Sequence, residues 1–168
     1  MTRTRPPIVS SLCGIVAAVL AWWLLTIVAP EAHTGMAPHL ALVLTALLPS
    51  IALLAAMILL QMGVRAMTAA IDPLAGTDSV LLRKNQRVIT NTVEQMTIFV
   101  PALLALAAGA PGARMAPVVA AAWTFALARL AFWIGYLAGT LLRAPGMAAT
   151  FAINVATLAA GAWVWLAS

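Results

Sequence analysis

The sequence predicts an all-α integral membrane protein, and three observations support this fold class. Hydrophobic residues make up 64% of the 168 residues and charged residues only 8%, whereas a soluble domain is about half apolar and a quarter charged. Five apolar runs are each long enough to cross a hydrocarbon core of about 30 Å as a helix. Ala and Leu dominate these runs, without the polar and apolar alternation of barrel strands. A soluble globular domain and a disordered chain are both excluded.

The five predicted helices correspond to the apolar runs, and helix-breaking residues separate them. Proline and glycine mark the connections, as in the segment 30–38 and at Pro145-Gly146. Pro49 and Pro101 fall inside runs, where a membrane bundle tolerates a kink. In chain order, the runs span residues 8–29, 40–64, 88–108, 116–142 and 148–167.

The first run follows Arg3 and Arg5, an arrangement that is shared by cleaved signal peptides and retained helices. The run from Ile8 to Ala29 is longer than the roughly 7–15 residues of a signal peptide's apolar region. We therefore expect this helix to be retained.

The single cysteine, Cys13, lies in the same run and cannot form an internal disulfide. We expect it to be a buried small hydrophobic residue, not a reactive thiol.

The basic residues are distributed unevenly over the predicted connections. With a cytoplasmic N-terminus, seven Lys and Arg residues lie on the cytoplasmic side and only Arg114 lies on the other, as the positive-inside rule requires. We attribute the net charge of +5 to this topology and expect no nucleic-acid partner. Five spans then place the C-terminus on the opposite side. The cytoplasmic residues are Arg3, Arg5, Arg65, Arg83, Lys84, Arg87 and Arg143.

Two predicted helices carry polar stripes at membrane depth. In the third helix, Arg87, Asn91 and Glu94 are spaced i, i+4, i+7 and lie on one face. Because the third and fourth helices are consecutive and antiparallel, their stripes are placed to face each other. Ionisable groups are costly inside a membrane, so each needs a partner or a function. The stripe of the fourth helix consists of Arg129, Phe132, Tyr136 and Arg143.

Glu94 and Arg129 allow two interpretations. In the first, they form a structural ion pair that joins the two helices. In the second, the charges that remain unpaired matter, because one acid cannot neutralise Arg87, Arg129 and Arg143 together. The surplus positive charge then favours a pocket for a small anion with polar arms.

The two stripes and their flanking residues resemble signatures of the MAPEG family, the membrane-associated proteins of eicosanoid and glutathione metabolism. The segment 83–94, followed by Phe99, is similar to the family's second-helix signature, and the segment 128–143 is similar to its third-helix signature. The resemblance implies a four-helix MAPEG-like transmembrane bundle with one extra N-terminal transmembrane helix. The expected parts are residues 1–35, with a helix at about 8–29, and residues 36–168, with helices at about 40–64, 85–108, 115–142 and 147–167.

The resemblance also implies that glutathione binds as a co-substrate. It assigns Arg143 to stabilising the glutathione thiolate and offers Arg65 as a second catalytic candidate, although both also fit a role as positive-inside flanks. We expect no metal site. The residues implied to bind glutathione are Arg87, Asn91, Glu94, Gln95, Arg129, Phe132 and Tyr136.

The family resemblance further implies a homotrimer, with glutathione between neighbouring subunits at the cytoplasmic side. Independently of it, Ala131, Gly135 and Gly139 recur every four residues, a spacing that permits close packing within one subunit or between subunits.

Three positions depart from the family pattern. Phe132 stands where the leukotriene-C synthase branch has Tyr, and Ile89 stands where a Gln is usual, so two possible hydrogen bonds to glutathione are missing. Met147 stands where prostaglandin E synthases have a further Arg, which argues against that reaction.

The predicted function is that of an integral membrane glutathione-dependent transferase or peroxidase. Its other partners would be membrane lipids and a lipophilic small molecule, either an electrophile or a lipid hydroperoxide. The alternative is a non-catalytic lipid-binding or scaffold member of the same family. An ion or proton carrier is disfavoured because a single intramembrane acid makes a poor relay.

Overall fold

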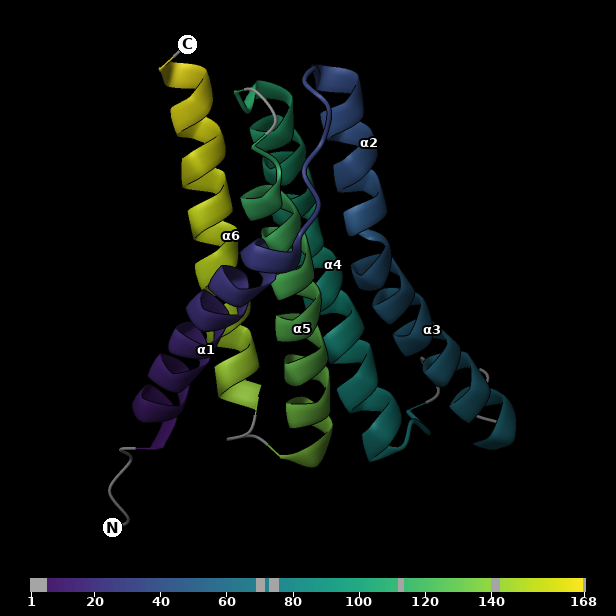
Figure 1. Ribbon diagram of the computed structural model, residues 1–168. Coiled ribbons are helices and arrows are strands. Elements are labelled where there is room, and N and C mark those ends of the chain that lie inside the picture. Colours follow the sequence, from purple (N-terminus) through teal and green to yellow (C-terminus); the bar gives the residue numbers. More distant parts are fainter. Residues whose placement is uncertain (1–5, 69–71, 73–75, 112–113, 140–142, 168) are drawn as a thin grey trace.

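The chain forms a bundle of helices in the computed structural model, which describes residues 6–68, 72, 76–111, 114–139 and 143–167 (Figure 1). The described part contains no strand, and five segments are long and apolar enough to cross a membrane. The predicted all-α membrane fold is therefore confirmed. The helices are α1 (Pro6–Val28), α2 (Met36–Ala46), α3 (Leu48–Thr68), α4 (Val80–Gly109), α5 (Ala116–Ala138) and α6 (Arg143–Leu166).

The second span is one apolar segment, Met36–Thr68, that is divided into α2 and α3 at Leu47. Pro49 explains the division, because proline has no N–H to donate and its ring disturbs the preceding turn. The Leu47 carbonyl instead accepts hydrogen bonds from the N–H groups of Ser50 and Ile51, at 3.0 and 3.1 Å. The sequence prediction of a tolerated kink at this proline agrees with the break.

The helix α5 is the most buried of the five spans, with α4 and α6 packed against it. Phe99 of α4 stacks on Phe125 of α5 with their ring centroids 4.1 Å apart, and both side chains are fully buried. At the other end of α5, the backbone of α6 comes very close: a Cβ atom added at Gly146 would lie 2.3 Å from the Phe132 nitrogen. Glycine is therefore required where α5 and α6 cross.

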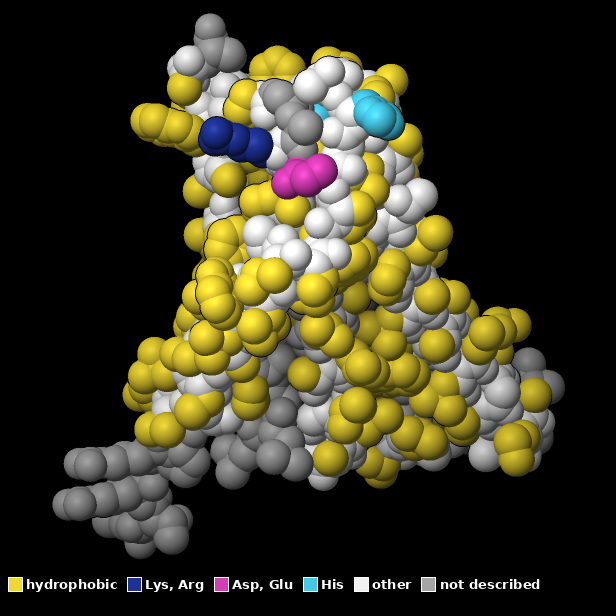
Figure 2. Space-filling view, viewed as in Figure 1, with side chains coloured by type: hydrophobic (Ala, Val, Ile, Leu, Met, Phe, Trp, Pro, Cys, Tyr) yellow, Lys and Arg dark blue, Asp and Glu magenta, His cyan; other side chains and the backbone are white. Residues whose placement is uncertain are grey.

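The helix α1 lies obliquely across α5 and α6 (Figure 1). Its Trp22 indole N–H donates a hydrogen bond of 3.0 Å to the Pro117 carbonyl of α5. The outer face of α1 is apolar and exposed, as expected for a lipid-facing helix. Cys13 lies on this exposed face, so the prediction that it would be buried is wrong. Figure 2 shows that hydrophobic side chains cover most of this side of the molecule.

Glu31 in the α1–α2 connection caps the first turn of α5. Its carboxylate oxygen Oε2 accepts hydrogen bonds from the backbone N–H groups of Met115 and Ala116, at 2.5 and 3.3 Å. These N–H groups have no partner within the helix, and a negative charge at this end is favoured by the helix dipole. The connection therefore fastens the N-terminal segment to the bundle.

Several helix boundaries differ from the sequence-based expectation, beginning with the second span, which runs from Met36 to Thr68 and not over about 40–64. The helix α4 begins at Val80, not near residue 85, because the Ser79 hydroxyl caps it by accepting from the Leu82 N–H at 3.2 Å. The helix α5 ends at Ala138, whereas a helix up to residue 142 was expected; residues 140–142 lie outside the described part. The helix α6 already begins at Arg143, and Pro145 fits its first turn, where the missing N–H costs nothing.

Candidate functional site

A pocket of about 740 Å³ lies at the end of the bundle where α4 begins, α5 ends and α6 begins. This end is the lowest in Figure 1. Four helices contribute to the lining. The helix α4 supplies polar side chains, α5 supplies aromatic ones, α6 supplies one arginine and apolar residues, and α1 supplies a single serine. The lining residues are Ser11, Gln86, Arg87, Thr90, Asn91, Glu94, Phe132, Tyr136, Arg143, Ala144, Met147, Ala148 and Phe151.

The polar side of the pocket is one face of α4. Arg87, Asn91 and Glu94 all line it, as their helical spacing suggests. Gln86 and Thr90 also lie there, although the sequence interpretation did not single them out. A signal for them was present, because Gln86, Thr90 and Glu94 are spaced i, i+4, i+8 and must share a face.

The aromatic side of the pocket is formed by Phe132 and Tyr136 of α5, whose rings meet edge to face with centroids 5.5 Å apart. Arg143 reaches the same place from the first turn of α6. Its guanidinium carbon lies 5.2 Å from the centroid of the Tyr136 ring, within the range of a cation–π interaction. Arg143 and Tyr136 therefore come together although they lie on different helices, not on one continuous helix as expected.

Arg129 does not line the pocket but lies behind its wall, with no exposed surface. Its Nη1 donates to Asn91 Oδ1 at 3.1 Å, and its Nη2 donates to Thr92 Oγ1 at 2.6 Å. The guanidinium also lies over the Phe132 ring, 4.2 Å from the centroid. Arg129 thus contacts two residues that line the pocket without reaching the pocket itself.

The ion pair between Glu94 and Arg129, one of the two interpretations of the sequence, does not form within the described part of the protomer. Glu94 is instead exposed at the pocket, while Arg129 is satisfied by amide and hydroxyl oxygens. Helical spacing places both residues on the facing sides of α4 and α5, but it does not fix how deep each side chain lies between them.

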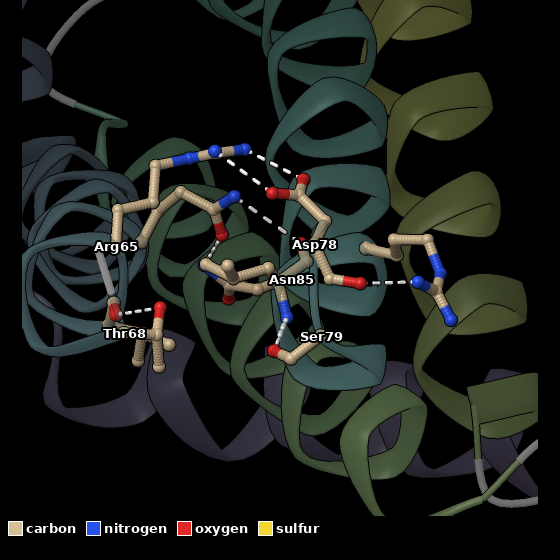
Figure 3. A network of polar contacts seen from close by, with 9 residues as sticks. Arg65, Thr68, Asp78, Ser79 and Asn85 are labelled. Carbon is tan, nitrogen blue, oxygen red and sulfur yellow. Dashed lines mark hydrogen bonds and ion pairs between the residues drawn. The ribbon is translucent and has the colours of Figure 1, made fainter. Parts of the chain in front are cut away.

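Two further predicted site residues lie outside this pocket in their own protomer. Arg65 makes a two-pronged ion pair with Asp78, with N–O distances of 3.0 and 2.8 Å. Figure 3 shows this pair beside the start of α4, where it joins the end of α3 to the connection that follows. The Gln95 Oε1 atom accepts a hydrogen bond of 2.6 Å from Asn154 Nδ2, so Gln95 links α4 to α6.

A buried amide network was missed by the sequence interpretation. Asn85 Nδ2 donates to the Gln61 Oε1 atom at 3.0 Å and to the Met57 carbonyl at 2.8 Å, while its Oδ1 accepts from Trp133 Nε1 at 2.9 Å. These contacts tie α3, α4 and α5 together. They give Asn85 of α4 a structural role, because buried polar groups need partners in an apolar bundle.

The pocket carries surplus positive charge. Arg87 and Arg143 line it together with a single acid, Glu94, and the guanidinium of Arg129 lies just behind the wall. No group of three His, Cys, Asp or Glu side chains that could hold a metal ion occurs among the described residues. With its amide, hydroxyl and phenol groups, the pocket is suited to a small anionic molecule that has several polar arms.

Comparison with known proteins gives one match. Residues 37–163 match the model of the MAPEG family, a range that includes nearly all of α2 to α6 and leaves α1 outside. No curated protein and no solved structure matches the chain.

Proposed function

Because the chain belongs to the MAPEG family, we propose that it is a glutathione-dependent transferase or peroxidase that acts on lipophilic electrophiles or lipid hydroperoxides. The observation that carries the proposal is the composition of one pocket. Two arginines, an acid, two amides and a phenol converge there at one end of a membrane bundle, and hydrophobic side chains cover most of the face seen in Figure 2. Glutathione is a small anion with an amine, two carboxylates and two amides, and it matches these groups.

The roles of the polar residues follow from their chemistry. Arg87 can bind a glutathione carboxylate, since guanidinium and carboxylate groups form strong charge-assisted pairs. Glu94 can accept from the amino group. Asn91 can donate to a carbonyl or carboxylate oxygen, because its own Oδ1 is already engaged by Arg129. Together these contacts would hold the peptide along the polar face of α4.

Arg143 is proposed to stabilise the thiolate. It lies on the opposite side of the pocket from α4, at Tyr136, beside the apolar residues of α6. The thiolate sulfur would attack the electrophilic carbon of the second substrate, forming a carbon–sulfur bond while the leaving group departs with its electron pair. With a hydroperoxide, the sulfur would attack the outer oxygen, the O–O bond would break to give an alcohol, and a second thiol would release water and form the disulfide.

A homotrimer is part of the proposal, because the pocket is open on the protomer surface. Gln86, Arg87, Thr90 and Glu94 are all exposed, although they belong to a membrane-spanning helix. A bilayer would leave these groups without partners. A neighbouring copy of the chain would cover them and complete the site. We place the pocket on the cytoplasmic side, where the basic residues of the loops gather.

The test is calorimetric titration of the detergent-purified protein with glutathione, followed by turnover assays with 1-chloro-2,4-dinitrobenzene and with cumene hydroperoxide. We expect saturable binding and turnover, both weakened in Arg87→Gln. Arg83→Gln is the matched control, since Arg83 lies one turn earlier on α4 and outside the pocket. Absence of glutathione binding would contradict the proposal. Binding without turnover would favour the alternative, a non-catalytic scaffold or lipid-binding member.

A further inference from the structure

The pocket has a second, mostly apolar side that faces α4. It consists of Met147, Ala148 and Phe151 of α6, together with Ser11 of α1. The tail of an apolar molecule that enters from the bilayer would lie against these residues, because past Arg143 the lining from α6 is uncharged, whereas the lining from α4 carries Arg87 and Glu94. Ser11 is the only group of α1 that lines the pocket, among the residues that the structure describes.

Helix α1 is held at this edge by direct backbone packing. A Cβ atom added at Gly14 would lie 2.2 Å from the Pro145 carbonyl oxygen, so α1 touches the first turn of α6 without an intervening side chain. The next residue, Gly146, touches the backbone at Phe132 in the same way. Two successive residues of α6 therefore make close backbone contacts in two directions: Pro145 contacts α1, and Gly146 contacts α5 at Phe132, which lines the pocket.

A second attachment fixes the far end of α1. Trp22 is bonded to the Pro117 carbonyl, and Glu31 caps α5. The position of Ser11 is thus set by contacts at both ends of the helix. Among the described residues that line the pocket, Ser11 is the one that lies outside the range 37–163 that matches the family.

We propose that Ser11 of α1, together with Met147, Ala148 and Phe151 of α6, forms the binding wall for the lipophilic co-substrate, and that the Ser11 side chain contacts the polar group of that substrate. The substrate class is a long-chain electrophile with a polar acceptor beside its reactive carbon, such as a 2-alkenal. The Ser11 hydroxyl donates a hydrogen bond to the carbonyl oxygen, and the chain extends along Met147 and Phe151. The inference rests on the proposed function for its chemistry, but the wall itself is a property of the protomer.

The first experiment compares Ser11→Phe with Ser10→Phe. Ser10 is the matched control, because it is the preceding serine, is half-buried like Ser11 and does not line the pocket. Turnover is measured with glutathione and trans-2-alkenals of six, nine and twelve carbons. In Ser11→Phe, kcat/KM for the twelve-carbon substrate should fall at least about tenfold relative to the six-carbon one, with the Kd for glutathione unchanged. Ser10→Phe should keep the wild-type chain-length profile. An unchanged profile in Ser11→Phe overturns the proposal.

The second experiment needs no turnover. In a Cys13→Ala background, Ser11→Cys or Ser10→Cys is labelled with a bimane dye, and dodecanal is added as a saturated long-chain aldehyde that has no conjugated double bond for a thiol to attack. A saturable fluorescence change at position 11 and none at position 10 supports the wall. If the wild type neither binds glutathione nor turns over but position 11 still responds, the proposed function is wrong and the wall stands. If the label at position 11 shows no fluorescence change, the proposed wall is wrong, whether or not the wild type binds and turns over glutathione.

Discussion

Arg129 donates a hydrogen bond of 3.1 Å to the side-chain oxygen of Asn91 from a position with no exposed surface. The bond fixes the orientation of the Asn91 amide, because its oxygen is turned toward the buried guanidinium. The amide nitrogen is then left as the donor that a ligand can use. A residue that does not line the pocket thereby determines the chemical character of one that does.

We predict that Arg129→Met weakens glutathione binding by about tenfold, the equivalent of one strong hydrogen bond. The reason is that the Asn91 amide loses its fixed orientation. The measurement is a double-mutant cycle by calorimetry with Arg129→Met, Asn91→Ala and the double variant. If Arg129 acts through Asn91, the double variant binds about as well as Asn91→Ala alone. Additive losses would show that Arg129 acts on the ligand independently.

Arg143→Gln should raise the pKa of the thiol of bound glutathione. A free thiol has a pKa near 8.5, and lowering it by about two units takes roughly 2.7 kcal/mol of preferential interaction with the thiolate. Without the guanidinium, the pKa rises toward its ordinary value, so activity at pH 7 falls and recovers at alkaline pH. The thiolate absorbance of bound glutathione is titrated in the wild type, Arg143→Gln and Arg143→Lys, with Lys expected to keep part of the effect. An unchanged thiol pKa in Arg143→Gln would refute the assignment.

The membrane topology is tested with single cysteines in a Cys13→Ala background. Thr77→Cys lies between α3 and α4, and His33→Cys lies between α1 and α2; both positions are exposed. We expect a membrane-impermeant maleimide to label them from opposite sides, with Thr77→Cys on the cytoplasmic side, because most of the basic residues lie there. Labelling of both from the same side would rule out one membrane crossing between them.

The oligomer is predicted to be a trimer in mild detergent. We attribute trimer formation to the exposed polar face of α4. Replacing Thr90 and Glu94, which are both exposed on this face, with Leu should therefore weaken assembly without unfolding the protomer. A matched control replaces Val93 and Ile98, which are exposed and apolar on the same helix, with Leu. Native mass spectrometry reports the subunit number. Monomers alone across several mild detergents would contradict the prediction.

Two glycine substitutions should change stability in opposite directions. Gly146→Ala is expected to destabilise the fold by about 1–3 kcal/mol, because the new methyl group would overlap the backbone of Phe132. Gly63→Ala, within α3, meets nothing within 4 Å and should stabilise by up to about 1 kcal/mol. Thermal unfolding in detergent distinguishes the two. Equal shifts of the same sign would show that close packing at Gly146 does not limit stability.

The sequence predicted the number of spans and the composition of the polar face, because both depend on local quantities. Apolar length determines whether a segment can cross the bilayer, and the helical period determines that Arg87, Asn91 and Glu94 share a face. The structure added what depends on distances between helices. Spacing could not show that Arg129 bonds to Asn91 and Thr92, or that Gln95 bonds to Asn154.

Contacts made by the segments that connect the helices could not be predicted from the sequence either. Asp78 pairs with Arg65 across a loop whose path no periodicity describes, and Glu31 caps a helix more than eighty residues later in the chain. The boundary between α5 and α6 was missed for a related reason. The residues from Gly139 to Leu142 include no charged side chain, so hydropathy alone does not indicate that the helix α5 ends at Ala138.

The contact between Gly14 and Pro145 joins the first helix of the chain to the last. At a translation rate of about 5–20 residues per second, Gly14 leaves the ribosome roughly 7–26 s before Pro145. During this interval α1 can already pack against α5, through Trp22 and Pro117, but the part of α1 at Gly14 still lacks its partner in α6. A chain that stops before α6 therefore never forms the contact between Gly14 and Pro145 and lacks the pocket residues that α6 supplies.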